Sequence, residues 1–131
     1  MKRNLNAKYK LNLKLVEKVI GSGITNGGQL DGLARYLFKK SYKGIYLKRD
    51  KLPLLRHHGD FAILNEPENI HWIAIFNLNG KLYEFDSYAR DMLGSGFRDF
   101  NKNNDAIDDQ GISQENCGAR VVSMMVSLFS K

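Results

Sequence analysis

The chain contains a single cysteine, Cys117, between a polar loop and a mostly apolar run that ends at Phe129. An apolar run of this kind predicts a buried helix. A helix N-terminus stabilises the thiolate form of cysteine, which is the nucleophilic form. Cys117 is therefore a candidate nucleophile, although a lone cysteine before an apolar helix is more often a small packed side chain.

A histidine and an aspartate are brought together by a predicted turn. A strand-like segment that begins at His71 and another that ends at Asp86 flank Asn79-Gly80, the dipeptide typical of a two-residue type I′ hairpin. If the residues on either side of this turn pair, His71 and Asp86 share a face as diagonal neighbours, roughly 7 Å apart at the backbone. An imidazole and a carboxylate can hydrogen-bond across that gap, so the spacing alone predicts a His–Asp pair.

These side chains have the types that cysteine catalysis needs. Cys117 would attack a carbonyl, His71 would take and return the proton, and Asp86 would orient the imidazole. The Gln110 side-chain amide and the backbone N–H of Cys117 could receive the oxyanion. Taken singly, each residue also has a structural interpretation: His71 as an ordinary strand residue, Asp86 as a turn or cap residue.

The order of these residues resembles a known family. His-Trp, then an aspartate after a strand, then Gln-Gly-x5-Cys-Gly is similar to the adenain-like (adenovirus-type) cysteine proteases, which are related to the Ulp-type SUMO proteases. The stretch from Gly44 to Pro53 also looks like adenain-like enzymes of small DNA viruses and large DNA transposons. By this resemblance the catalytic residues are Cys117, His71, Asp86 and Gln110, with Trp72 and Gly118 as substrate or oxyanion support.

The resemblance implies an endopeptidase that processes viral structural precursors next to small residues such as glycine. A deconjugating protease for ubiquitin-like proteins is the alternative within the same chemistry. No cofactor or metal is expected, and stimulation by DNA or by a peptide is compatible with the family. With one cysteine, the chain cannot bind an activating peptide through a disulfide to a second cysteine. The lack of a secretory signal and the single cysteine predict a reducing compartment of the host cell, and the resemblance implies packaging in the virion.

Positive charge is concentrated in the first part of the chain. Residues 1–56 contain 14 Lys or Arg and three acids, while residues 57–131 have a net charge of −5. This asymmetry is compatible with DNA binding through residues 1–56, or with lysines that solvate the outer faces of helices. A basic nucleic-acid-binding protein with a merely buried cysteine is therefore an alternative of another class. Metal binding by His57, His58 and Asp60 is disfavoured, because adjacent residues of an extended segment point to opposite faces.

The length of 131 residues predicts one domain, 1–131, and a monomer without a membrane span or secretory signal. Apolar spacing predicts helices over about 12–20, from about 26 to 38, and beyond 116. Short β-type runs cover 44–47, 61–64, 71–76 and 82–86, whereas 87–109 has no clear pattern. The expected fold is α+β: a small antiparallel or mixed sheet packed against a central buried helix that carries Cys117, with N-terminal helices covering the sheet.

Overall fold

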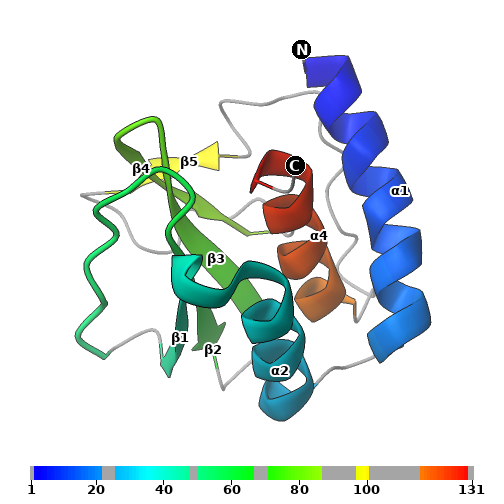
Figure 1. The fold of residues 1–131 in the computed structure, drawn as a ribbon, viewed down its shortest axis with the longest axis horizontal. Helices are drawn as coiled ribbons and strands as arrows, with labels where there is room; N and C mark the ends of the chain where they lie inside the picture. The colour runs from blue at the N-terminus through cyan, green and yellow to red at the C-terminus, as the bar shows by residue number, and fades with distance from the viewer. Residues whose placement is uncertain are drawn as a thin grey trace.

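The computed structural model describes residues 2–21, 26–47, 50–66, 71–86, 97–100 and 116–129. The fold is α+β, as predicted (Figure 1). In chain order the elements are α1 (Lys2–Ile20), α2 (Gly27–Phe38), the short 3-10 helix η1 (Lys39–Ser41), β1 (Tyr42–Leu47), β2 (Phe61–Glu66), β3 (His71–Leu78), β4 (Lys81–Phe85), β5 (Arg98–Asp99) and α4 (Cys117–Phe129).

The strands form one mixed sheet in the order β1-β2-β3-β4-β5. The pairs β2–β3 and β3–β4 are antiparallel, while β1–β2 and β4–β5 are parallel. The four predicted strands are present, and each extends one or two residues beyond one of its predicted limits. The short strand β5 was not predicted, because a two-residue strand is too short to show a periodic pattern.

The predicted turn between β3 and β4 is confirmed. Asn79 and Gly80 have φ values of 54° and 87°, and a type I′ turn requires positive φ at both central residues. Leu78 pairs with Lys81, and the ladder continues to Ala74 opposite Phe85. The register that was inferred from the dipeptide is therefore correct over the whole hairpin.

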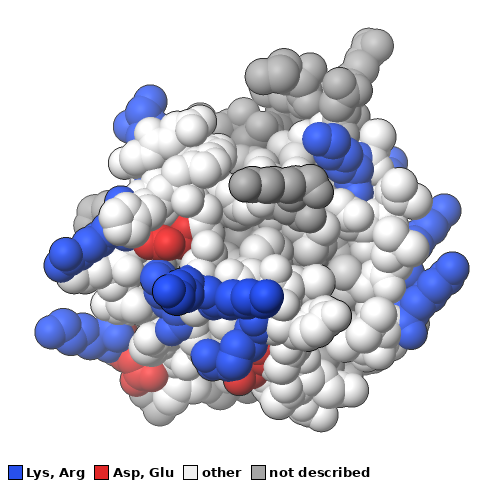
Figure 2. Space-filling model, viewed as in Figure 1, with Lys and Arg blue, Asp and Glu red and all other residues white. Residues whose placement is uncertain are grey.

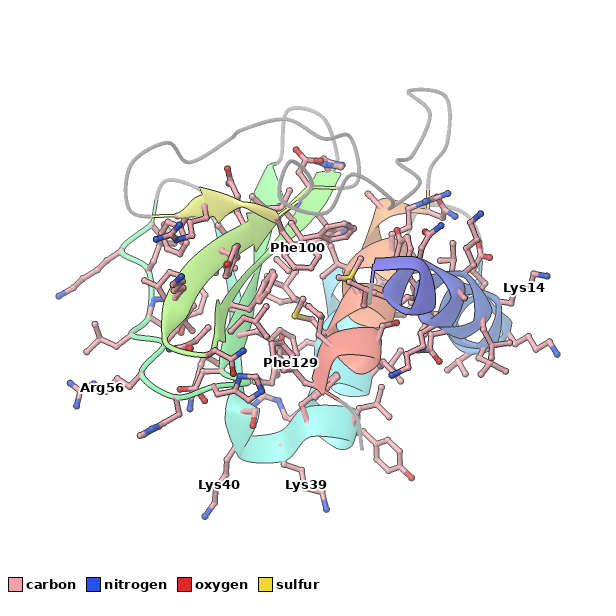
Figure 3. The ribbon with its side chains drawn as sticks, turned by 90° about the horizontal axis from the view of Figure 1, so that it is seen from above. Lys14, Lys39, Lys40, Arg56, Phe100 and Phe129 are labelled. Carbon is pink, nitrogen blue, oxygen red and sulfur yellow. The ribbon has the colours of Figure 1, made fainter. Side chains whose placement is uncertain are left out.

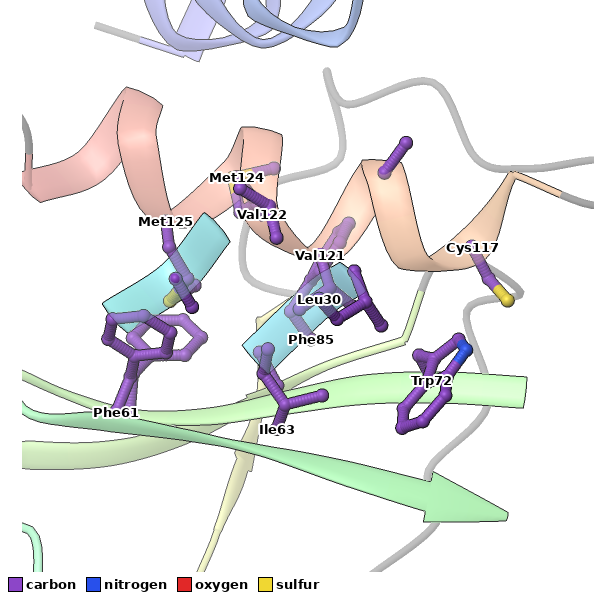
Figure 4. Packing of buried hydrophobic residues seen from close by; sticks show 14 of the residues in the cluster. Leu30, Phe61, Ile63, Trp72, Phe85, Cys117, Val121, Val122, Met124 and Met125 are labelled. Carbon is purple, nitrogen blue, oxygen red and sulfur yellow. The ribbon is translucent and has the colours of Figure 1, made fainter. Parts of the chain in front are cut away.

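Each face of the sheet packs against a different part of the chain. One face contributes apolar side chains such as Phe61, Ala74 and Phe85 to the main core, where they meet buried residues of α4 (Figure 4). The opposite face, which includes Ile73 and Ile75, packs against the connection between β1 and β2. In that connection Leu55 is buried, and its carbonyl accepts a hydrogen bond from the Asn77 side chain at 2.9 Å. The parallel pair β1–β2 is thus linked by an irregular segment instead of a helix.

Helix α1 differs from its prediction in length and in position. It begins at Lys2, ten residues before the predicted start, because Tyr9 is also a core residue: its ring packs edge-on against Phe85, with centroids 5.9 Å apart. The prediction that both N-terminal helices cover the sheet is wrong for α1, since α4 lies between the sheet and α1 (Figure 1). Val19 of α1 is 69% exposed.

Helix α2 begins as its sequence predicts and packs against β1. The Asn26 side chain accepts a hydrogen bond from the Gln29 backbone at 2.8 Å, and the Gln29 side chain accepts one from the Asn26 backbone. This reciprocal capping box satisfies two N–H groups at the helix start. The first helical residue, Gly27, lies against Trp72: a Cβ atom there would come within 3.4 Å of the indole.

Helix α4 is buried on most sides, yet it is not uniformly apolar. Arg120, Ser123 and Ser127 are buried among its apolar residues. Both serine hydroxyls donate to the backbone carbonyl four residues earlier, at 2.6 and 2.7 Å, which satisfies them inside the core. The Ser127 hydroxyl also accepts a 2.9 Å hydrogen bond from Asn12 of α1.

Candidate active site

Three of the predicted site residues lie at the ends of elements. His71 is the first residue of β3, Asp86 directly follows β4, and Cys117 is the first residue of α4. The Nε2 atom of His71 and Oδ1 of Asp86 are 2.5 Å apart, and both side chains are fully buried. The His–Asp pair predicted from the hairpin register is therefore present. Because both residues lie at strand ends, we infer that they approach α4 around the end of the sheet.

The third residue, Cys117, acts directly on this pair. Burial lowers the pKa of the His71 imidazole, because it disfavours the charged ring. Hydrogen bonds with Asp86 and with the Cys117 side chain, together with the negative charge of both groups, outweigh burial and raise the pKa to about 9. The charge of His71 is thus coupled to Asp86 and to Cys117, the only cysteine of the chain.

The contact with Asp86 assigns the two ring nitrogens of His71. Since Nε2 lies against the carboxylate, Nδ1 is the nitrogen that can exchange a proton with the thiol. Nδ1 is itself buried. Asp86 can therefore fix the tautomer of a neutral imidazole and stabilise the charged ring after proton transfer. The chemistry available to this arrangement is formation of a thiolate beside an imidazolium.

Cys117 lies at the start of α4. The first N–H groups of a helix have no partner within its ladder and carry partial positive charge. Asn116 directly precedes the helix, and its carbonyl accepts the Arg120 N–H at 3.0 Å as the first helical hydrogen bond. Cys117 is 4% exposed, so its thiol is almost fully shielded from bulk water.

Trp72 directly follows His71 in the sequence, and Gly118 directly follows Cys117. Both were predicted as supporting residues, and both are buried. Figure 4 shows the Cys117 thiol and the Trp72 indole pointing toward one another from α4 and β3. Trp72 therefore contributes a wall beside the thiol. Gln110, the predicted oxyanion donor, lies outside the described residues, and its assignment remains a prediction.

Several polar residues that hold the site in place were not predicted. The Asn65 side chain of β2 donates to the His71 carbonyl at 3.3 Å, which ties the start of β3 to its neighbour. Asn116 and Arg120 flank Cys117 in sequence and hydrogen-bond to each other at 2.9 Å. An asparagine directly before a helix is a recognisable N-cap signal. A single arginine within an apolar run is also visible in sequence, but its partners are not.

The histidines outside this site have structural contacts. His58 accepts the Asn79 backbone N–H at 3.0 Å and packs edge-on against Phe129, while the Asp60 carboxylate accepts the His57 backbone N–H at 3.0 Å. These contacts connect the segment before β2 to the β3–β4 turn and to α4. Within the described ranges, no group of three His, Cys, Asp or Glu side chains has the arrangement of a metal site.

The described basic residues of the first part of the chain belong to several elements. Figure 2 shows one face of the molecule, with a group of lysines and arginines toward its lower left and others at its right edge and upper right. In Figure 3, Lys14 of α1 points away from Lys39 and Lys40 of η1, and Arg56 points in a third direction. DNA binding by the basic residues and solvation of the surface by them both stay predictions. Among the helices of the described residues, none has the length and apolarity that crossing a membrane requires.

No protein-family model, curated protein or solved structure matches this chain.

Proposed function

We propose that the protein is a cysteine endopeptidase with Cys117 as nucleophile, His71 as general base and acid, and Asp86 as the residue that orients the imidazole. The observation that carries this proposal is the 2.5 Å contact of the buried His71 imidazole with Asp86, together with the only cysteine, which begins α4 and contributes to the raised pKa of His71. The order His, Asp, Cys and the Gln-Gly-x5-Cys-Gly motif support an adenain-like enzyme, since the same residues carry that resemblance.

The reaction begins when the Cys117 thiolate attacks the carbonyl carbon of the scissile peptide bond. The His71 imidazolium then donates its proton to the leaving amine as the carbon–nitrogen bond breaks, which leaves a thioester on Cys117. In the second half, His71 accepts a proton from water as that water attacks the thioester. The carbon–sulfur bond then breaks, which regenerates the Cys117 thiolate beside the His71 imidazolium and frees the carboxylate product. Asp86 stabilises the charged imidazole in both halves.

The tetrahedral intermediates carry a negative oxygen that must be stabilised. We assign this role to the backbone N–H of Cys117, which lies at the positive end of α4, together with the Gln110 side chain. Removal of one oxyanion donor typically costs about 3 kcal/mol of transition-state stabilisation. Replacement of Gln110 by alanine should therefore slow peptide cleavage about a hundredfold and leave stability almost unchanged.

The proposed substrates are viral structural precursors cut next to glycine, with a virus or transposon as the source of the enzyme. A host cell's reducing compartment and the virion are the proposed locations, the protein acting as a monomer. Stimulation by DNA or by a non-covalent peptide belongs to the same proposal. The alternative within this chemistry is deconjugation of ubiquitin-like proteins after their Gly-Gly ends. Cleavage of capsid-type peptides compared with SUMO or ubiquitin fusions separates the two.

Covalent labelling tests the nucleophile. The protein is incubated with a peptide vinyl sulfone that ends in glycine, and adducts are located by mass spectrometry of proteolytic fragments. We expect one adduct, on Cys117, formed by the wild type and by a His57→Gln control. His71→Gln should react at least a hundredfold more slowly, because the thiolate loses its imidazolium partner. Peptide hydrolysis retained by Cys117→Ala would refute the proposal.

The burial of Cys117 adds a second expectation. Because the thiol is 4% exposed, a peptide can reach it only when neighbouring parts of the chain move aside. Saturation of the labelling rate at high inhibitor concentration is the expected sign of such a step. If a thiol-reactive probe leaves Cys117 unlabelled until the protein unfolds, the cysteine is a packing residue. That outcome favours the alternative function, a basic nucleic-acid-binding protein.

A further inference from the structure

A network of side-chain hydrogen bonds joins α1 to the first turn of α4. The Asn116 side chain donates to the Glu17 carboxylate at 3.1 Å and accepts from Arg120 Nε at 2.9 Å. Arg120 Nη1 in turn donates to the Tyr9 hydroxyl at 3.3 Å. Two residues of α1, eight positions apart, are thus linked through Asn116, which directly precedes α4, and Arg120 of α4.

This network is mostly shielded from water. Tyr9, Asn116 and Arg120 are 1%, 9% and 8% exposed, and Tyr9 also packs against Phe85 in the core. A hydrogen bond in such surroundings is costly to break, because the separated groups stay buried without their partners. The network therefore holds the first turn of α4 at a defined distance from α1.

The first turn of α4 is also where the proposed chemistry takes place. It contains the Cys117 thiol and the Cys117 N–H, while His71 is the first residue of β3 and Asp86 directly follows β4. The contact between thiol and imidazole therefore depends on the placement of α4 relative to the ends of β3 and β4. A shift of about 1 Å in a reacting group can cost about a hundredfold in rate.

We propose that Glu17, acting through Asn116, is a positioning residue that aligns the Cys117 thiol with His71, and that Tyr9 does the same through Arg120. Neither residue of α1 touches the thiol or the substrate in this assignment. The inference rests on the proposed function, because it gives α1 a role in the same site.

The test compares three variants of the full chain. Glu17→Ala removes the acceptor for Asn116, whereas Glu17→Gln keeps an oxygen that can accept the same hydrogen bond. Lys18→Ala, at the neighbouring exposed position of α1, is the matched control. Tyr9→Phe removes only the hydroxyl that Arg120 contacts and retains the ring that packs against Phe85.

The primary measurement is the rate of Cys117 alkylation by iodoacetamide between pH 5 and 10, with thermal unfolding recorded in parallel. We expect Glu17→Ala to lower the rate at pH 7 about tenfold and to change the pH profile, because the thiol is then no longer aligned with the His71 imidazole. Glu17→Gln and Lys18→Ala should retain the wild-type pH profile. Tyr9→Phe should shift the profile in the same direction as Glu17→Ala.

A failure of the positioning role can be told apart from a failure of the proposed function, because alkylation requires no peptide substrate. A wild-type pH profile for Glu17→Ala would overturn the positioning role. So would a profile of Glu17→Gln that matches Glu17→Ala, since the retained acceptor would then have no effect. If the wild type alkylates as expected but cleaves no peptide, the proposed function fails while the alignment of thiol and imidazole stands.

Discussion

The protonation of His71 couples the candidate site to the stability of the fold. Its pKa is raised from 6.5 to about 9 in the folded protein, so the folded state holds a proton that the unfolded chain releases between these values. The stabilisation is fully present below about pH 6.5 and is lost as the pH rises through about 9. The difference between these two pKa values corresponds to about 3 kcal/mol of unfolding free energy.

This prediction can be checked by urea unfolding from pH 6 to 9.5. Over that range we expect the unfolding free energy of the wild type to fall by about 3 kcal/mol more than that of His71→Gln, because the variant has no imidazole to titrate at this position. His57→Gln, which changes an exposed histidine outside the site, should follow the wild type. Parallel curves for the wild type and His71→Gln would show that the His71 pKa is not raised.

The sequence was sufficient to predict the contacts of some site residues and not those of others. The pairing of His71 with Asp86 could be predicted, because a two-residue turn fixes register and register fixes which residues are neighbours. The roles of Asn116 and Arg120 could not, since Arg120 meets Tyr9, 111 positions earlier in the chain. No local pattern encodes a hydrogen bond between helices that far apart in sequence.

Among the elements, the β3–β4 hairpin places both His71 and Asp86, so its turn should matter for the site. Gly80 has φ of 87°, and a Cβ atom added there would meet no other atom within 4 Å. The cost of Gly80→Ala is therefore backbone strain alone, about 1 kcal/mol. Gly80→Val should cost more, because a β-branched side chain is still less compatible with positive φ.

Urea unfolding measures these costs, with Asn79→Gly as the control, since glycine accepts the φ of 54° at Asn79. Asn79→Gly should stay within about 0.5 kcal/mol of the wild type. If Gly80→Ala proved as stable as the wild type, the left-handed conformation assigned to this turn would be incorrect.

The elements that were harder to predict share a physical feature. Strands β3 and β4 could be placed because their turn is local, whereas the parallel pairing of β1 with β2 depends on a connection without periodicity. The early start of α1 was missed because residues 2–11 are rich in polar side chains, and Tyr9 is buried there by contact with Phe85. Tertiary contacts, not local propensity, decide such cases.

For the whole molecule, the arrangement of sheet, α4 and α1 makes a single cooperative unit the expected behaviour. The main core includes Tyr9 and Val16 of α1 together with residues of the sheet and of α4. Removal of a buried aromatic side chain usually costs about 3–5 kcal/mol. We therefore expect Tyr9→Ala to destabilise the entire chain by about that amount and not merely to release α1.

The chain's single tryptophan allows a direct test. Trp72 fluorescence reports on β3, while far-UV circular dichroism reports mainly on the helices, including α1. In one cooperative domain the two urea transitions coincide in the wild type and shift together in Tyr9→Ala. Leu11→Ala, at a position of α1 that is 61% exposed, should leave both transitions nearly unchanged. If the dichroism transition of Tyr9→Ala moved while the fluorescence transition stayed in place, α1 would be an appendage, and its proposed alignment of Cys117 would lose its basis.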